Sequence, residues 1–225
     1  MSDLGESRES FFSRVRSAVA RQGEPVAPPA LDAALLRTVP VDADAVALFE
    51  QRASGVGVTV RRTRAAGVVE EVVQVVGGLG GRRVAVGGTF DWHEGITAAL
   101  AGAGCEVTDG RTAAGGELFD VEVGVTGVEA AVAESGTLVC EAGPGRSRSM
   151  TLVPAAHVAV VPASRVVADL VDWFVARFGS TATAGQLPSG VALITGPSKT
   201  ADIEGILVTG VHGPGRVVVV LVEDA

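Results

Sequence analysis

Residues 194–214 read ITGPSKTADIEGILVTGVHGP, and this stretch indicates how the rest of the chain is organised. The apolar run that ends at Ile194 is typical of a strand, and Gly196-Pro197-Ser198 is typical of a turn. Lys199 is the only lysine in the chain, and Thr200 is a candidate N-cap for a helix after the turn. A strand that leads through a turn into a helix N-terminus presents backbone N–H groups and partial positive charge to an anion. The stretch therefore predicts an open α/β sheet with a ligand site at this turn.

The sequence before this stretch alternates between helical and strand-like patterns. We expect helices over 43–53, 68–76, 96–103, 128–133 and 166–178, a helical turn at 117–119, and strands over 57–61, 82–86, 105–108, 121–125, 137–140, 157–161 and 216–222. This alternation predicts an α/β fold with a mainly parallel sheet flanked by helices. The last strand is apolar at consecutive positions, which indicates burial on both faces.

The N-terminal region has a different pattern from the rest of the chain. Residues 6–22 carry Phe11, Phe12, Val15 and Val19 at helical spacing, and a Pro-containing segment at 24–29 follows. We expect a helical extension and linker over 1–40 and one α/β domain over 41–225. The helix could pack on its own domain or on a neighbouring chain.

Composition excludes several classes of function. The formal net charge of −8 argues against attraction to nucleic acid or an anionic membrane. The acidic start does not resemble a signal peptide, and no apolar run reaches membrane-spanning length. Cys105 and Cys140 lack metal-ligand spacing, which predicts reduced thiols and no iron–sulfur cluster on this chain. We expect a cytoplasmic protein that binds no metal.

Four polar residues are candidates for a site, each with a structural alternative. Glu134 precedes Ser-Gly at a predicted break, where it could act as a general base or bind a cation, or lie exposed in a turn. Thr137 would place a hydroxyl beside it, or simply begin a strand. His212, flanked by glycines, could bind a ligand or transfer a proton. His157 fits a structural role better, and we expect His93 at the surface or at a helix cap.

Anion binding has three further candidate locations. Arg146 and Arg148 lie in a Gly-rich loop, where a guanidinium could bind a carboxylate or phosphate, or be solvated. At 196–200, helix capping explains Ser198 and Thr200 as well as an anion does. The Gly87-Gly88-Thr89 turn lacks the full spacing of a dinucleotide or P-loop motif, and a plain strand-to-helix turn explains it better.

Several motifs, taken in order, resemble the LUD domain family, in its lactate utilization protein C type. They are Val125-Thr126-Gly127, Glu134-Ser135-Gly136-Thr137, Arg146, Leu152-Val153-Pro154, His157-Val158, the run from Gly196 to Glu204, and Gly210-Val211-His212-Gly213-Pro214. The resemblance covers about 124–222. The family's usual Glu-Thr-Gly-Thr is Glu-Ser-Gly-Thr here, which keeps the hydroxyl.

The resemblance implies a fold similar to the NagB/RpiA/CoA-transferase group, in which relatives bind sugar phosphates or CoA esters. It implies a three-component system that oxidises L-lactate to pyruvate, with iron–sulfur clusters on cysteine-rich partner proteins. This chain would be the component without a cluster, accessory or ligand-binding, and inactive alone. A small anionic ligand is a candidate partner, and the implied site residues are Glu134, Thr137, Arg146, Gly196, Pro197, Ser198, Lys199, Thr200, His212 and Gly213. The alternative is a stand-alone CoA-transferase-like or sugar-phosphate-isomerase-like enzyme that uses Glu134.

Overall fold

The computed structural model describes residues 7–20, 32–88, 90–113, 115–179, 187–201 and 205–225. The chain forms two compact units, Met1–Leu35 and Leu36–Ala225. The first contains the predicted N-terminal helix, α1 (Arg8–Ala20), in which no residue is buried. A short helix, α2 (Ala33–Leu36), lies where the two units meet in sequence. The predicted linker over 24–29 lies outside the described residues.

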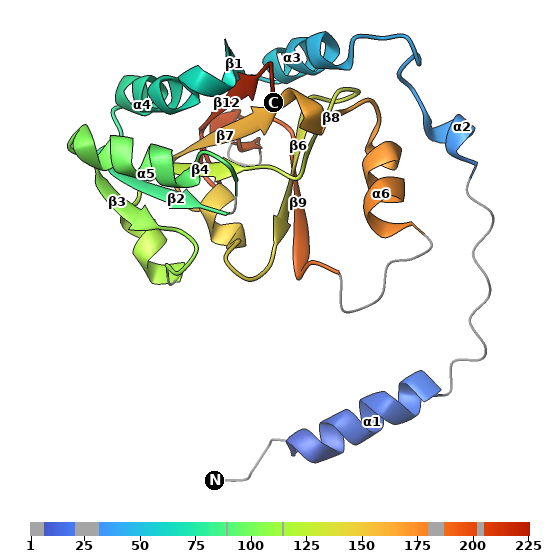
Figure 1. Ribbon diagram of the computed structural model, residues 1–225. Helices are drawn as coiled ribbons and strands as arrows, with labels where there is room; N and C mark the ends of the chain where they lie inside the picture. Colours follow the sequence, from blue (N-terminus) through green and yellow to red (C-terminus); the bar gives the residue numbers. More distant parts are fainter. Residues whose placement is uncertain (1–6, 21–31, 89, 114, 180–186, 202–204) are drawn as a thin grey trace. The chain divides into compact units, whose positions relative to one another are not determined.

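The second unit is built on a six-stranded parallel sheet, as the alternating pattern predicts (Figure 1). Its strands, in the order in which they lie, are β1 (Thr59–Thr63), β12 (Arg216–Val222), β7 (Ala156–Pro162), β4 (Val123–Gly127), β2 (Arg83–Gly87) and β3 (Glu106–Asp109). Each pair in this order is parallel. β12 is buried on both faces, as its continuous apolar run predicts.

Two layers cover the sheet. On one face lie α4 (Val68–Leu79) and α5 (His93–Gly102), which pack side by side (Figure 1) against alternate valines of β2, β4, β7 and β12. On the other face lies α3 (Ala45–Gly55), capped by the Asp44 side chain, with Phe49 fully buried. Two 3₁₀ helices, η2 (Gly115–Asp120) and η3 (Arg148–Thr151), cover Ala85 on that same face through Leu118 and Met150. Helices on both faces keep the four central strands from water, as this sheet type requires, whereas the edge strands β1 and β3 are partly exposed.

A second, four-stranded sheet lies against the first. Its strands, in order, are β8 (Val166–Val167), β5 (Ala130–Val132), β6 (Thr137–Ala142) and β9 (Gly190–Ile194). The helix α6 (Leu170–Phe178) covers part of it through Trp173. Asp169 caps α6 and also accepts hydrogen bonds from the Thr38 amide and hydroxyl at 2.8 and 2.9 Å. The segment before α3 is thereby fastened to the α6 N-terminus.

Two predicted helices are strands in the structure. Residues 130–132 form β5, fully buried between β6 and β8. A helix this short would form too few hydrogen bonds to offset the free-energy cost of nucleation. The small alanine side chains can be buried inside the sheet instead. The helix predicted from Thr200 is also wrong for the described residues. Lys199–Thr200 (β10) pairs antiparallel with Val208–Thr209 (β11), and the β-branched Thr200, Val208 and Thr209 favour strand over helix.

The predicted helix over 166–178 is half right. Its first two residues form β8, parallel to β5, and the helix begins only after the Asp169 cap. The other predicted elements lie within a few residues of their observed positions. η3 and its neighbour η4 (Ala163–Arg165) had no sequence-based prediction. No helix among the described residues has the length and apolarity needed to span a membrane.

Candidate functional site

The connections of the parallel sheet diverge between β2 and β4. From β2 the chain runs through α5 outward to β3, whereas β4 is followed in the opposite direction by β7 and then β12. The segments that leave the carboxyl ends of β2 and β4 therefore part from each other, and a crevice opens between them. In open α/β sheets, ligands bind at such a switch point.

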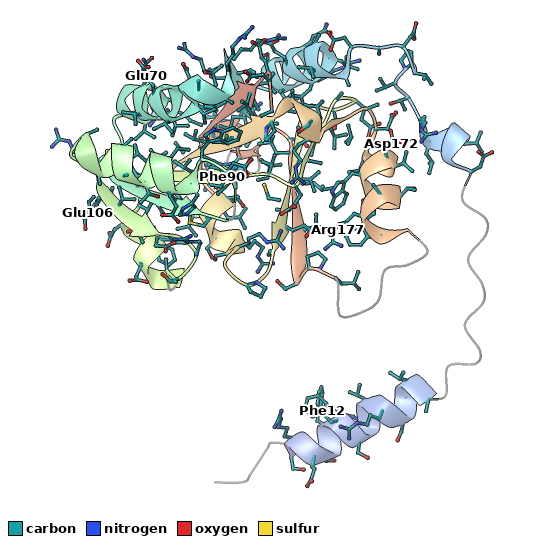
Figure 2. All side chains as sticks on the ribbon, in the orientation of Figure 1. Phe12, Glu70, Phe90, Glu106, Asp172 and Arg177 are labelled. Atoms are coloured by element: carbon teal, nitrogen blue, oxygen red, sulfur yellow. The ribbon has the colours of Figure 1, made fainter. Side chains whose placement is uncertain are left out.

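Glycines at these strands allow neighbouring segments to approach closely. A side chain at Gly124 on β4 would place its Cβ 2.4 Å from the Met150 carbonyl oxygen, and one at Gly127 would come within 2.9 Å of Phe90 Cβ. η3 and Phe90 can therefore lie directly against β4. Figure 2 shows Phe90 pointing into the interior of the unit, whereas Glu70 and Glu106 project outward.

A cavity of about 440 Å³ lies at this switch point, and we call it the switch-point cavity. Its walls come from the ends of β2, β4 and β7, from the 143–151 loop, and from β6 and β9 of the second sheet. This volume is typical of ligand sites. The lining residues used below are Gly87, Gly88, Phe90, Asp91, Trp92, Thr126, Glu129, Cys140, Glu141, Arg146, Ser147, Arg148, Arg165 and Ala192.

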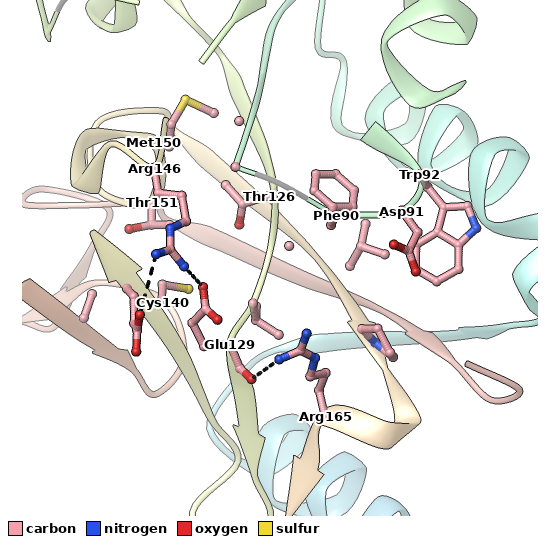
Figure 3. A pocket seen from close by; sticks show the side chains of 18 of the residues that line it. Phe90, Asp91, Trp92, Thr126, Glu129, Cys140, Arg146, Met150, Thr151 and Arg165 are labelled. Atoms are coloured by element: carbon pink, nitrogen blue, oxygen red, sulfur yellow. Dashed lines mark hydrogen bonds and ion pairs between the residues drawn. The ribbon is translucent and has the colours of Figure 1, made fainter. Parts of the chain in front are cut away.

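Paired charges form one wall of the cavity. Figure 3 shows Arg146 extending from its loop to the carboxylate of Glu129. A second carboxylate, that of Glu141, also lies within ion-pair distance of Arg146. Arg146 bonds Glu129 directly and lies 3.7 Å from Glu141 Oε2. Glu141, whose side chain is 2% exposed, is bound more closely by Arg177, at 2.5 Å. Because each carboxylate has its own guanidinium, this wall carries little net charge.

Arg148 and Arg165 also line the cavity, and their charges are not compensated in this way. Among the described residues, none forms a hydrogen bond or ion pair with the Arg148 guanidinium. Arg165 donates to a neutral partner, the Glu129 backbone carbonyl, at 3.4 Å (Figure 3). The remaining acid in the lining is Asp91, which lies beside Trp92. The cavity therefore has guanidinium groups available to an anion in a chain whose net charge is −8.

A buried pair of side chains lies behind the cavity wall. Thr126 lines the cavity, and its hydroxyl lies 2.8 Å from Nε2 of His157, which is fully buried. Burial lowers the pKa of His157 to about 4, so the ring is neutral at physiological pH. Nearby, burial and the Glu129 carboxylate raise the pKa of the Cys140 thiol to about 12, so it is no nucleophile at neutral pH.

The structure brings Arg146 and Arg148 into the cavity but places Glu134, Thr137 and His212 elsewhere. Glu134 accepts a hydrogen bond from the Leu170 amide at 3.0 Å, and so lies at the start of α6, with the Thr38 hydroxyl also 3.0 Å from its carboxylate. Thr137 is buried in a chain of hydroxyls, 2.7 Å from both Ser135 and Thr195. His212 is exposed, and neither it nor Glu134 lines the switch-point cavity.

The turn at 196–200 packs onto the C-terminal end of α3. Gly196, at φ +83°, lies so close to Val56 that a Cβ there would be 2.6 Å from its carbonyl oxygen, and Lys199 donates to the same oxygen at 2.9 Å. A lysine at a helix C-terminus stabilises the helix dipole. Ser198, Lys199 and Thr200 do not line the switch-point cavity, and a two-residue strand lies at Lys199–Thr200 where a helix N-terminus was predicted. Pro197 contacts Gly57, and Gly213 lies beside Ser198.

Of the two positions expected for His93, the surface is wrong, but the residue does lie at the start of a helix. It is the first residue of α5 and is 4% exposed, with Nε2 3.3 Å from the Val86 carbonyl oxygen. The Gly87-Gly88 turn does join a strand to a helix, and it also lines the cavity. Sequence reasoning missed Thr126, Glu129 and Arg165. Each lies at or shortly after the carboxyl end of a parallel strand, and such positions gather at one edge of the sheet, but the sequence does not give the strand order that makes these residues neighbours.

Comparison with known proteins identifies the family. The family model described as the LUD domain matches residues 59–222, which is most of the chain. The chain belongs to the LUD domain family. The matched residues run from the start of β1 to the end of β12, so they contain the whole parallel sheet and every residue named above as lining the cavity.

Several relatives in this family carry the name lactate utilization protein C. The one from Exiguobacterium sp. is 44% identical over 113 residues, which are 46% of this chain and 45% of the relative. Those from Halalkalibacterium halodurans and Bacillus subtilis are each 40% identical, over 103 and 102 residues and 45% and 42% of their own lengths. The matches thus span less than half the length of these relatives.

A solved structure shares the fold. The crystal structure of a DUF162 family protein from Deinococcus radiodurans superposes with a TM-score of 0.56 and covers 80% of this chain and 97% of its own. At 23% identity, the likeness is one of fold. Both comparisons agree with the resemblance and the α/β fold that the sequence indicated.

Proposed function

We propose that this LUD domain protein acts in lactate utilization, as a component without a cluster in a system that oxidises L-lactate to pyruvate. The observation that carries the proposal is the switch-point cavity, which gives the chain a ligand site with available guanidinium groups in its lining. The names of its relatives support the link to lactate. The chain would bind a small anionic ligand there, while partner proteins carry the electrons.

The number of cysteines supports the proposal that partner proteins, and not this chain, carry the iron–sulfur clusters. The chain has two, Cys105 and Cys140, whereas an iron–sulfur cluster usually needs four thiolates. Cys105 is half-buried beside the Gly81 carbonyl, and Cys140 lies in the cavity wall. Among the described residues, no group of three or more His, Cys, Asp or Glu is placed to hold a metal. Iron–sulfur clusters would therefore reside on cysteine-rich partners.

The alternative of a stand-alone enzyme that uses Glu134 receives less support. One carboxylate oxygen of Glu134 accepts a hydrogen bond from the Leu170 amide, and the other lies 3.0 Å from the Thr38 hydroxyl. That hydroxyl also lies 2.9 Å from Asp169, and Glu134 lies outside the switch-point cavity. A base or nucleophile needs a free oxygen within reach of its substrate. The position of Glu134 instead suits a role in holding α6.

A tagged copy of the full chain, expressed in its own cells during growth on L-lactate, tests the proposal. We expect cysteine-rich proteins to co-purify and the eluate to transfer electrons from L-lactate to a dye. The chain purified alone should do neither. Recovery of the chain without partners, together with undiminished lactate oxidation in cells that lack it, would contradict the proposal.

A further inference from the structure

A second depression lies next to the switch-point cavity, and we call it the serine–arginine basin. It measures about 530 Å³ and shares Arg146, Ser147 and Arg148 with the cavity lining. Three segments distant in sequence form it, with the residues Arg111, Ala142, Gly143, Gly145, Arg146, Ser147, Arg148, Ser149, Ser189 and Gly190. None of these lining residues is acidic, although acids outnumber bases in the chain by 26 to 18.

The loop that carries most of the basin is held in a defined turn. The amides of Gly143 and Arg146 each donate to the other residue's carbonyl, at 3.0 and 2.9 Å. Gly145 has φ +68°, and a Cβ there would lie 3.9 Å from Arg111 Cβ, so the loop lies next to the segment after β3. The basin is thus a feature of the fold, because local hydrogen bonds and a close approach fix its walls.

The three arginines of the basin differ in whether a carboxylate already pairs with them. Arg111 is bound to Asp109 and Glu94, and Arg146 is bound to Glu129. Arg148 is exposed and has no such partner among the described residues, so its guanidinium donors are available to a ligand.

The serines of the basin also differ. The Ser147 oxygen accepts from the Ser149 amide at 3.3 Å, which leaves its O–H able to donate. Ser189 instead donates its O–H to the Ala142 carbonyl oxygen, at 3.1 Å. Arg148 and Ser147, which line both the basin and the cavity, are therefore among the donors that the fold leaves available to a ligand; the Ser149 hydroxyl in the basin is another.

We propose that the serine–arginine basin binds the phosphate group of a ligand whose remainder occupies the switch-point cavity. Guanidinium and hydroxyl donors without lining carboxylates suit a phosphate, which has three terminal oxygens to satisfy and carries up to two negative charges. The ligand of this chain is then a phosphorylated molecule larger than lactate. The claim that the rest of the ligand occupies the switch-point cavity rests on the proposed function, whereas the phosphate site itself does not.

Inorganic phosphate is the probe for this site, titrated against the full chain and followed by ³¹P NMR line broadening and by the melting temperature. We expect Arg148→Gln to weaken phosphate binding about tenfold or more, because a charge-assisted hydrogen bond is lost. Arg82→Gln is the matched control. Arg82 is also an exposed arginine, but it precedes the amino end of β2, whereas the cavity lies at the carboxyl end of that strand.

A second variant separates this inference from the proposed function. Ala192→Phe fills the switch-point cavity without touching the basin lining, so it should leave phosphate binding intact even if lactate utilization is lost. Equal phosphate affinity in wild type and Arg148→Gln would overturn the inference. So would the absence of any phosphate binding at tens of millimolar, or tighter binding of the carboxylates citrate and L-lactate.

Discussion

At the scale of single residues, the two histidines that the sequence placed near a site differ in their surroundings. His157 is fully buried against Thr126, and burial lowers its pKa from the ordinary value of 6.5 to about 4. His212 is exposed. A titratable group whose folded-state pKa is lowered binds fewer protons in the folded than in the unfolded chain, so stability depends on pH.

We expect acid to destabilise the protein through His157. Above pH 6.5 the residue is neutral in both states and adds no pH dependence. As the pH falls from 6.5 to 4, only the unfolded chain takes up the proton, so the free energy of unfolding drops by up to about 3 kcal/mol and then levels off. Urea denaturation at several pH values measures this.

The matched pair of variants isolates that contribution. His157→Gln should flatten the pH dependence between 6.5 and 4, whereas His212→Gln should leave it as in the wild type. Carboxylates with lowered pKa, such as Asp109, act in the same direction at lower pH and are common to all three proteins. An unchanged slope in His157→Gln would show that burial does not control this histidine.

Glu134 provides the second prediction at this scale. Glu134→Ala removes the acceptor for the Leu170 amide at the start of α6, which should lower the free energy of unfolding by about 1 kcal/mol. Glu134→Gln keeps an acceptor oxygen and should lose less. Both variants should retain lactate oxidation in the pull-down assay. Loss of activity in a fully stable Glu134→Gln protein would instead support the stand-alone enzyme.

At the scale of elements, the turn between β5 and β6 depends on the absence of a side chain. Gly136 has φ +69°, and a Cβ there would lie 2.3 Å from the Ala53 amide nitrogen and 2.6 Å from Ala53 Cα, in α3. This turn joins the second sheet to the helix that covers the first. Both the conformation and the contact exclude larger residues.

Two glycine variants distinguish the cost of a left-handed backbone conformation from the cost of a clash with a neighbouring helix. Gly80 ends α4 at φ +74° with open space around it, so Gly80→Ala should cost only the strain of a left-handed residue, about 1–2 kcal/mol. Gly136→Ala adds a clash with the backbone of α3 and should cost at least twice as much. Denaturant titration compares them. Equal losses would mean that α3 moves away freely from the turn.

Elements were predictable where their pattern was long and repeated. The alternation of helix and strand from 43 to 108 led directly to the parallel sheet, since buried parallel strands and amphipathic helices have distinct periods. The second sheet was harder to predict. β5 is a three-residue alanine-rich run and β10 a two-residue strand, so neither shows a period, and tertiary pairing decides their structure.

The same distinction applies to the site. The sequence pointed to Arg146, because an arginine in a Gly-rich loop is visible locally. It could not show that Thr126, Glu129 and Arg165 join it, because that depends on which strands are neighbours. The turn at 196–200 looked like an anion site, and only the fold reveals that Lys199 binds the end of α3 instead.

At the scale of the whole molecule, the site follows from the topology. Connections that diverge between β2 and β4 open a crevice, and the second sheet closes it into a cavity. The guanidinium groups of Arg148 and Arg165 in its lining are then available to an anion, although the chain as a whole is acidic. Function in this account therefore depends on the cavity space and not on any residue of the predicted turn at 196–200.

The most direct test is growth on L-lactate of cells that lack this protein and carry one of two variants of β9. Ala192→Phe projects into the cavity, whereas Leu193→Phe lies on the opposite face of the same strand, where the leucine is 47% exposed. With both variants folded and equally abundant, we predict that Leu193→Phe restores growth on lactate and Ala192→Phe does not. Normal growth with Ala192→Phe would contradict the assignment of the cavity as the functional site.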